Sequence, residues 1–230
     1  MSRRSGVRVS TRPAAGGGRW LDIAPERFER WLRGFDDRHH VVLTMYESGI
    51  VRFEAADAAV AECHPPFPPL ACPAGGRGAR AGPLVDHILR RRTVGVLLAR
   101  LGGHAIGVFE GSQLVASKVG SRYVHGRNQA GGQSQARFQR RRDQQARQAT
   151  AAAQQTVVRV MVPYADRLDA VVLGGDRRAV AAVLDDPRLR PLAALAADRF
   201  LTVPDPKRAI LERTPTQFRA VRVRLLEAGV

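Results

Sequence analysis

The apolar residues follow helical spacing in some segments of the chain and strand-like spacing in others. The mostly apolar run at 20–23 predicts a short strand. A proline then opens the segment 25–35, and the first turn of a helix accepts proline well. In that predicted helix Phe28, Trp31 and Leu32 recur at helical spacing, so we expect them to form its buried stripe.

Six further segments favour strands, because they are rich in β-branched and aromatic residues and are bounded by turn residues. The first two predict a hairpin, the third is expected to extend the same sheet, and the last three predict an antiparallel meander. In chain order they are 41–46, 50–54, 58–63, 93–100, 104–110 and 113–119.

The rest of the chain interleaves helices with strands. The longest helix is predicted over 134–162, where strong helix formers continue without Gly or Pro. Its first half is polar and its second half apolar. Strands that alternate with helices favour an α/β fold, a mixed β-sheet flanked by helices. The other segments are helices over 84–91, 178–184 and 191–197, strands over 170–173 and 200–203, and an alternating tail over 218–225 that fits a strand or, as the alternative, a terminal helix.

Composition divides the chain into four parts. With 230 residues, 44% of them hydrophobic, the chain is expected to form one main core. The segment 1–18 is rich in Arg, Gly and Ser and predicts a disordered basic arm. Residues 19–63 then make an N-terminal α/β portion, 64–83 a Pro/Gly-rich loop or linker, and 84–230 the principal domain.

The charge of the chain predicts a polyanionic partner. Lys and Arg number 37 against 21 Asp and Glu, which gives a net charge of +16. Only Lys118 and Lys207 are lysines, and the abundance of Ala, Gly and Pro indicates a GC-rich genome, so compositional bias supplies part of the charge. Arginine is nevertheless the better residue for bidentate phosphate contacts and for stacking on bases. Nucleic acid is the expected partner.

Cysteine content and hydropathy predict a cytoplasmic protein without a membrane contact. Cys63 and Cys72 are the only cysteines, and no apolar run approaches the roughly 20 residues needed to cross a membrane. The N-terminal segment lacks the apolar core of a secretory signal. Cys63, His64, Cys72 and His87 suggest zinc, but their spacing is not that of a structural zinc site, so we expect no metal.

A glycine-rich tip stands directly before the predicted long helix. Between 120 and 132 the sequence has no apolar periodicity, which predicts an exposed loop that ends in Gly131, Gly132 and Gln133. Paired glycines let a backbone approach another molecule closely. The backbone N–H of Gln133 can donate to a developing oxyanion, and its side-chain amide can orient a water molecule. This arrangement suits an electrophile that is already activated, such as an ester.

Arginines flank this tip on both sides. Several recur at three- and four-residue spacing in the predicted helix and are expected to share one phosphate-facing side. The RNA-binding residues predicted in this way are Arg122, Arg127, Arg137, Arg140, Arg141, Arg142 and Arg147.

The same stretch resembles a known family. Gly-Gly-Gln-Ser, the Arg137-Phe138 pair, the arginines that follow and the lead-in His125-Gly126-Arg127 are similar to the middle domain of eukaryotic and archaeal class 1 peptide-chain release factors. The likeness runs in matching order from the meander at Thr93 through the Val-Val-Leu-Gly-Gly run to about Glu212. Asn128 to Ala130 is an insertion relative to that pattern.

The resemblance is greatest to the release-factor-like peptidyl-tRNA hydrolases of ribosome quality control, the VLRF type. It implies that 84–230 is a catalytic domain that hydrolyses peptidyl-tRNA on stalled or split large ribosomal subunits, with ribosomal RNA as a further partner and without a cofactor. By match, Gly131, Gly132 and Gln133 inherit the catalytic roles. Because the sequence shows no separate codon-reading domain, codon-specific termination is not expected.

Other readings of the chain remain open. In a non-catalytic RNA-binding factor the loop would only fill a groove, and a metal-dependent nuclease would need a carboxylate cluster beside the basic patch, where none is evident. The pairs Asp166/Asp169 and Asp185/Asp186 stand beside predicted element ends, so we assign them structural roles. Gly174-Gly175 lacks a phosphate-loop sequence and is interpreted as a tight strand-to-helix turn.

Overall fold

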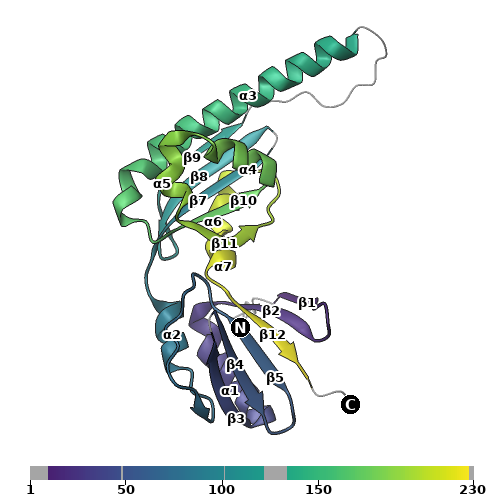
Figure 1. The fold of residues 1–230 in the computed structure, drawn as a ribbon, viewed down its shortest axis with the longest axis vertical. Coiled ribbons are helices and arrows are strands. Elements are labelled where there is room, and N and C mark those ends of the chain that lie inside the picture. Colours follow the sequence, from purple (N-terminus) through teal and green to yellow (C-terminus); the bar gives the residue numbers. More distant parts are fainter. Residues whose placement is uncertain (1–9, 48, 101, 122–133, 228–230) are drawn as a thin grey trace, which may run out of the picture. The chain divides into compact units, whose positions relative to one another are not determined.

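The chain folds into two compact units. A computed structural model describes residues 10–47, 49–100, 102–121 and 134–227 (Figure 1). Unit 1 comprises Met1–Arg90 with Thr216–Val230, and unit 2 comprises Arg91–Pro215. Each unit has its own cluster of buried hydrophobic side chains. The expectation of one main core is therefore wrong, because composition fixes how much apolar surface can be buried but not into how many clusters it divides.

Unit 1 is built on a seven-stranded antiparallel sheet. The segments predicted as a first strand, a hairpin and its extension are all strands of this sheet, and they pair with strands from both ends of the unit. In spatial order the strands are β1 (Ser10–Pro13), β2 (Arg19–Ile23), β12 (Val221–Leu226), β5 (Val60–His64), β4 (Ile50–Ala55), β3 (Val41–Glu47) and β6 (Gly76–Arg77).

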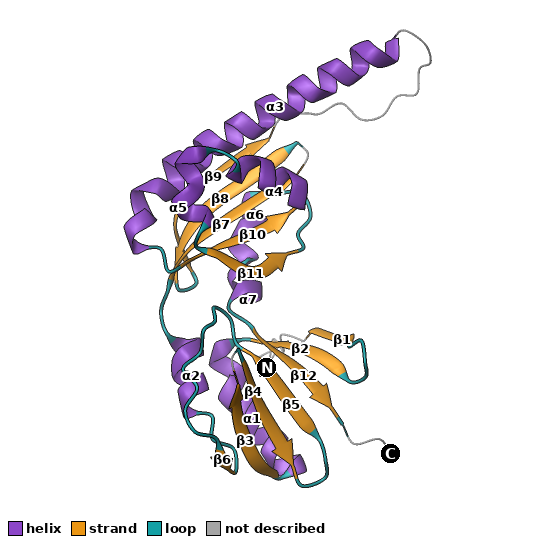
Figure 2. Cartoon of the chain, in the orientation of Figure 1, coloured by secondary structure: helices purple, strands orange, loops and turns teal. Residues whose placement is uncertain are grey.

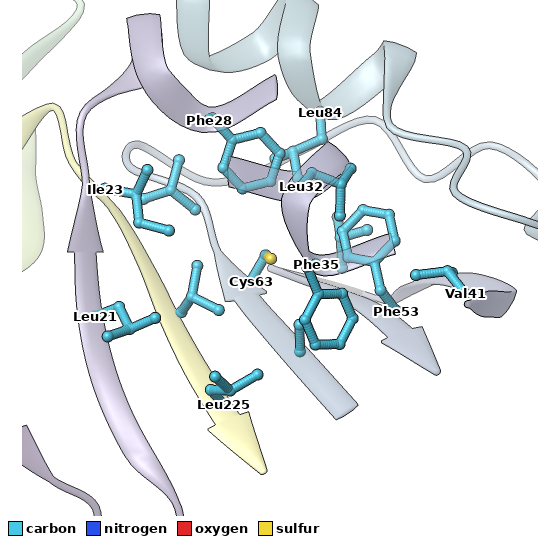
Figure 3. Close-up of a cluster of buried hydrophobic side chains, with 14 of the residues drawn as sticks. Leu21, Ile23, Phe28, Leu32, Phe35, Val41, Phe53, Cys63, Leu84 and Leu225 are labelled. Atoms are coloured by element: carbon cyan, nitrogen blue, oxygen red, sulfur yellow. The ribbon is translucent and has the colours of Figure 1, made fainter. Parts of the chain in front are cut away.

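Two helices, α1 (Pro25–His39) and α2 (Gly82–Leu89), cover the core of unit 1. Phe28 and Leu32 of α1 point toward the inner side chains of the sheet, as predicted (Figure 3). Trp31 is only partly buried and stacks on Phe35, with ring centroids 5.8 Å apart. The buried stripe of α1 therefore continues through Phe35 rather than Trp31.

Strand β12 confirms the strand interpretation of the alternating tail and excludes the helical one. Val221, Val223 and Leu225 are buried in the core of unit 1, while Arg222 and Arg224 stand on the opposite face of the sheet. The strand lies between β2 and β5, which are separated from it in sequence by the whole of unit 2.

Unit 2 contains a mixed five-stranded sheet and confirms the predicted fold class. Its predicted meander is present as β7 (Thr93–Arg100), β8 (Gly103–Glu110) and β9 (Gln113–Ser121), which pair antiparallel. On the other side of β7, two strands run parallel to it, β10 (Ala170–Gly175) and then β11 (Ala196–Leu201).

Helices cover both faces of the unit 2 sheet. The long helix α3 (Ser134–Met161) and α4 (Arg177–Leu184) pack on one face together with Ile106 and Val108 (Figure 2). The intervening Gly107 faces Leu211 of α6 on the other side. The remaining helical segments are the 3-10 turns Val162–Arg167 and Pro187–Leu189 and the short helices α5 (Arg190–Ala193), α6 (Arg208–Arg213) and α7 (Pro215–Phe218).

Two local expectations are wrong for the same reason. The helix expected over 191–197 ends at Ala193, and Ala196 already pairs with Val171 in the sheet. Likewise Ser10–Pro13, within the arm expected to be disordered, pairs with β2 as strand β1. In both cases backbone hydrogen bonding to a neighbouring strand overrides local residue preference.

Gly174 and Gly175 were expected to form the turn between strand and helix, but they are the last two residues of β10 and pair with Leu98 and Ala99, so the chain turns at Asp176. The φ of Gly175 is +102°, and a Cβ built there would stand 2.2 Å from the carbonyl oxygen of Ala99. Asp176 then caps α4 by accepting a hydrogen bond from the backbone N–H of Ala179, at 2.8 Å. No side chain fits at position 175 without displacing β7.

We expect Gly175→Ala to lower the free energy of unfolding by about 1–3 kcal/mol, because the substitution adds a steric clash to an unfavourable φ. Gly111→Ala is the matched control, since Gly111 also has a positive φ, +64°, but its nearest neighbour is the Arg91 Cγ at 3.7 Å. Urea unfolding of both variants measures the difference. Equal losses in the two variants would contradict the close approach at Gly175.

Candidate functional site

Helix α3 has a docked half and a projecting half. From Ala153 onward it buries Val157, Val160 and Met161 against the sheet. Gly95 of β7 makes this packing possible, because a Cβ there would stand 3.2 Å from the Met161 Sδ. The 28 residues of α3 rise by about 42 Å, whereas an eight-residue strand such as β8 spans about 26 Å. The N-terminal half of α3 therefore continues past the sheet (Figure 2).

The predicted arginine positions lie on the side of α3 away from the sheet. At about 100° per residue, positions 137, 140, 141 and 147 share an arc of roughly 120°. The docked residues Ala153, Val157 and Val160 cluster roughly on the opposite side of the helix. Arg140 and Arg147 are both exposed. Position 142 falls outside the arc, so the helix unites four of the five arginines predicted along it.

The catalytic tripeptide adjoins this helix in sequence. Gly131, Gly132 and Gln133 lie outside the described residues, as do Arg122 and Arg127. Strand β9 ends at Ser121, and α3 begins at Ser134, the residue that follows Gln133. For Arg137, Arg141 and Arg142 the structure describes the helical backbone and not the side chains. The tripeptide is therefore joined directly to the first turn of the helix that carries the arginine arc.

A groove that the sequence did not predict lies under the middle of α3. It has a volume of about 580 Å³ and is bounded by α3, α4, the β7–β8 turn and the end of β9. Alanines of α3, among them Ala146 and Ala149, form its apolar wall. Arg100, Lys118 and Arg178 stand around it with Asp176. Small residues along a helix have no signature that separates a groove from ordinary packing, so alternation and spacing could not reveal it.

His104 of β8 lines the groove and fixes this strand to α3. Its Nε2 lies 3.0 Å from the Thr156 Oγ1, and that hydroxyl donates to the carbonyl of Ala152 at 2.8 Å. Because the single hydroxyl hydrogen is used in this way, the Nε2–H of a neutral His104 must be the donor to Thr156. Gly120 makes room for the ring, since a Cβ there would stand 2.5 Å from it. Burial lowers the pKa of His104 below its ordinary value.

The other residues singled out in the sequence have separate surroundings. Cys63 is buried in the core of unit 1, which raises the pKa of its thiol, whereas Cys72 is exposed. His87 Nε2 lies 2.9 Å from the carbonyl oxygen of Pro66. Among the described residues no group of three or more His, Cys, Asp or Glu is arranged to hold a metal ion.

The carboxylates have the structural roles expected of them where their contacts are defined. Asp186 accepts from the backbone N–H and the guanidinium of Arg188, which lowers the pKa of its carboxyl group. Asp169 accepts from the backbone N–H of Thr93, at 2.7 Å. Both side chains thus fasten element ends rather than face a shared site.

Comparison with protein families decides the class of the chain. Residues 92–224 match the profile of the Actinobacteria/chloroflexi VLRF1 release factor family, over more than half of the sequence. The chain belongs to this family. It is release-factor-like, and its function lies in translation, in association with the ribosome. Membership confirms the resemblance that the Gly-Gly-Gln segment and its flanking strands predicted.

Solved structures give weaker likenesses. The archaeal translation termination factor aRF1 is 14% identical, over 86% of this chain and 73% of that one, with a TM-score of 0.38. The Vms1 mitochondrial localization core is 12% identical, over 86% and 80% of the two chains, with a TM-score of 0.40. Dom34 of S. cerevisiae is 6% identical, over 89% of this chain and 66% of that one, with a TM-score of 0.35. Scores this low do not establish the activity of this family member. No curated protein sequence matches it.

In the part of this VLRF1-family chain that the structure describes, no helix is long and apolar enough to cross a membrane.

The His104 contact predicts that unit 2 is sensitive to acid. In the unfolded chain His104 takes up a proton as the pH falls through 6.5, whereas the buried ring takes one up only at lower pH. The free energy of unfolding therefore falls as the pH drops from 6.5 to the lowered pKa of the folded state, and below that pKa this group adds no further loss.

Melting temperatures between pH 7.5 and pH 5 check this for the wild type and for His104→Gln, which keeps a donor but does not titrate. The wild type is expected to lose more stability than the variant over this range. His40→Asn is the control, because it replaces an exposed histidine that lies in unit 1 rather than in unit 2. Identical pH profiles for wild type and His104→Gln would disprove the proposed cause.

Proposed function

We propose that this chain hydrolyses the ester bond of peptidyl-tRNA on the large ribosomal subunit, in the cytoplasm, with Gly131, Gly132 and Gln133 at the reacting bond. One observation carries the proposal. The tripeptide directly precedes a long helix whose docked face is buried and whose opposite side is lined by arginine positions. Membership of a release-factor family supports the assignment.

The long helix acts as a shaft between the body of unit 2 and the substrate. Arg140 and Arg147 are exposed, and with Arg137 and Arg141 they would contact phosphates of ribosomal RNA and of the tRNA. Arg122, Arg127 and Arg142 would add contacts around the loop. Because the docked half fixes the direction of α3, each phosphate contact along the shaft helps to place the tripeptide.

At the ester, Gly131 and Gly132 let the backbone pass close to the terminal ribose, because neither carries a Cβ. The Gln133 amide orients a water molecule. The oxygen of this water then attacks the ester carbonyl carbon. The tetrahedral oxyanion is stabilised by hydrogen-bond donors, among them the backbone N–H of Gln133. The carbon–oxygen bond to the tRNA then breaks, and the ribose oxygen takes a proton that derives from the water. A glutamine amide is not a base, so positioning and electrostatics provide the acceleration, and the chain needs no cofactor for it.

Release of a labelled nascent chain from purified large subunits that carry peptidyl-tRNA tests this proposal. Gly132→Ala and Gln133→Ala are each expected to slow release on the order of 10²-fold. The first adds a Cβ where the backbone must pass close to the ribose, and the second removes the amide that orients the water, so each misplaces the reacting groups. Gln129→Ala is the matched control, because it removes the same side chain from the same loop outside the tripeptide.

Binding of every variant to the subunits is measured in parallel by co-sedimentation and is expected to change less than about twofold. Unchanged release by Gln133→Ala, or no release by the wild type, would show a non-catalytic RNA-binding factor instead. Cleavage of RNA that requires Mg²⁺ would show a nuclease.

A second test concerns the arginine arc. The double variant Arg140→Gln/Arg147→Gln should reduce the salt dependence of subunit binding, because each lost phosphate contact lowers the slope of log K against log salt by roughly 0.7–0.9. Release at saturating enzyme should fall much less than in Gln133→Ala, because the tripeptide itself is unchanged. Arg91→Gln/Arg208→Gln is the control, because both arginines are exposed in the same unit but lie outside α3. Equal slopes for the two double variants would exclude the arc as the docking surface.

A further inference from the structure

The face of the unit 1 sheet opposite its core carries a row of basic and aromatic side chains. The strand register places Arg12 opposite Trp20, Trp20 opposite Arg224, Arg224 opposite Glu62 and Glu62 opposite Arg52. Directly opposed residues on one face lie about 5 Å apart. Since Leu21, Val223, Cys63 and Phe53, adjacent to these in sequence, are buried in the core, the row must be on the outer face.

Acidic residues on this outer face organise the arginines without neutralising them. Glu62 is shared between Arg52, at 2.9 Å, and Arg224, at 3.5 Å. Asp22 is shared in the same way between Arg12 and Arg222, each at 3.6 Å. Two carboxylates thus hold four guanidinium groups, which leaves an excess of positive charge.

The arginines remain accessible to a ligand. The side chains of Arg12, Arg222 and Arg52 are 52%, 39% and 36% exposed, whereas Glu62 is only 16% exposed. An approaching ligand therefore meets guanidinium N–H donors before it meets the carboxylate beneath them.

Trp20 gives this charged surface an aromatic centre. Its ring is half-buried and packs at a tilt against His64, with centroids 5.2 Å apart. In the strand register it stands between the positions of Arg12 and Arg224. Arg224 is mostly covered, because its guanidinium binds Glu62 and the backbone carbonyls of the β1–β2 turn. The exposed donors near the indole are therefore those of Arg12 and Arg222. Together they offer a stacking surface for a base and donors for neighbouring phosphates.

We propose that the outer face of the unit 1 sheet binds single-stranded RNA, with a base stacked on Trp20 and with phosphates held by Arg12, Arg52 and Arg222. Arginine is suited to phosphate because its planar fork donates two parallel hydrogen bonds. An acidic peptide would satisfy the charge but would leave the indole without a matching group. This surface belongs to unit 1 and is independent of the loop and helix proposed to act on peptidyl-tRNA.

Tryptophan fluorescence tests the stacking directly. The chain has two tryptophans, so in a Trp31→Phe variant Trp20 is the sole reporter. A ten-nucleotide oligoadenylate is expected to quench its emission, because a stacked base contacts the ring. Inorganic polyphosphate of matched charge engages the arginines without a base and is expected to leave the emission nearly unchanged. Quenching by polyphosphate alone, or by neither probe, would overturn the proposal.

The phosphate contacts are tested by anisotropy of the labelled oligoadenylate. All chains in this experiment carry Arg140→Gln and Arg147→Gln, which removes two exposed arginines of the arc on α3. Adding Arg12→Gln and Arg222→Gln should weaken binding roughly tenfold at low salt and lower the slope of log K against log salt by about 1.4, or 0.7 for each of two contacts. Adding Arg91→Gln and Arg208→Gln instead removes equal charge from unit 2 and should change affinity less than about twofold.

Equal losses in the two sets would show that only net charge matters and would overturn the proposal. A loss of polyglutamate binding in the Arg12/Arg222 set, with RNA binding unchanged, would show a surface for acidic proteins and would also overturn it. Thermal melting verifies that unit 1 stays folded in every variant. Because none of these measurements involves peptide release, the result is independent of whether the chain is a hydrolase.

Discussion

The packing of the C-terminal half of α3 on the unit 2 sheet is the interaction on which the candidate site depends. Met161 approaches the sheet closely because position 95 is a glycine. A partly buried hydrogen bond from His104 to Thr156 fixes the helix to β8. A helix transmits direction along its length, so this contact also determines where its far end points. The projecting half has strong helix formers but no apolar stripe to bury, so it depends on continuing the helix that the docked half begins.

Much of the fold could be predicted from the sequence, because residues that are buried in a helix or strand recur at the period of that element. Alternation identified β12, helical spacing identified α1, and an unbroken run of helix formers without Gly or Pro gave the length of α3. Alternation says which residues face the core but not which strand lies alongside, so the position of β12 between β2 and β5 was not predictable. The division of the buried residues into two clusters was missed for a related reason, since it depends on pairings between segments far apart in the chain.

The candidate site divides in the same way. The Gly-Gly-Gln segment and the arginines were identified because their chemistry is visible in consecutive residues. His104, Thr156 and Gly120 were not, because three different elements bring them together and each is unremarkable in its own segment. Gly95 and Gly107 lie within predicted strands and Gly120 begins the predicted loop, and in the structure each marks a place where a large side chain crosses close to the sheet.

The central position of β12 also has a consequence for how the chain is made. Unit 2 is continuous in sequence, so it can fold as soon as Pro215 has left the ribosome, whereas β2 and β5 lack the strand that joins them until Val221–Leu226 has followed. Domains usually fold in the order of their synthesis. Here unit 1, whose synthesis begins first, is the last to complete its fold. The inner residues of β2 and β5 therefore stay open to solvent while unit 2 is synthesised. Pairing across so long a stretch of chain is also slow, so completion of unit 1 should set the pace at which the whole protein matures.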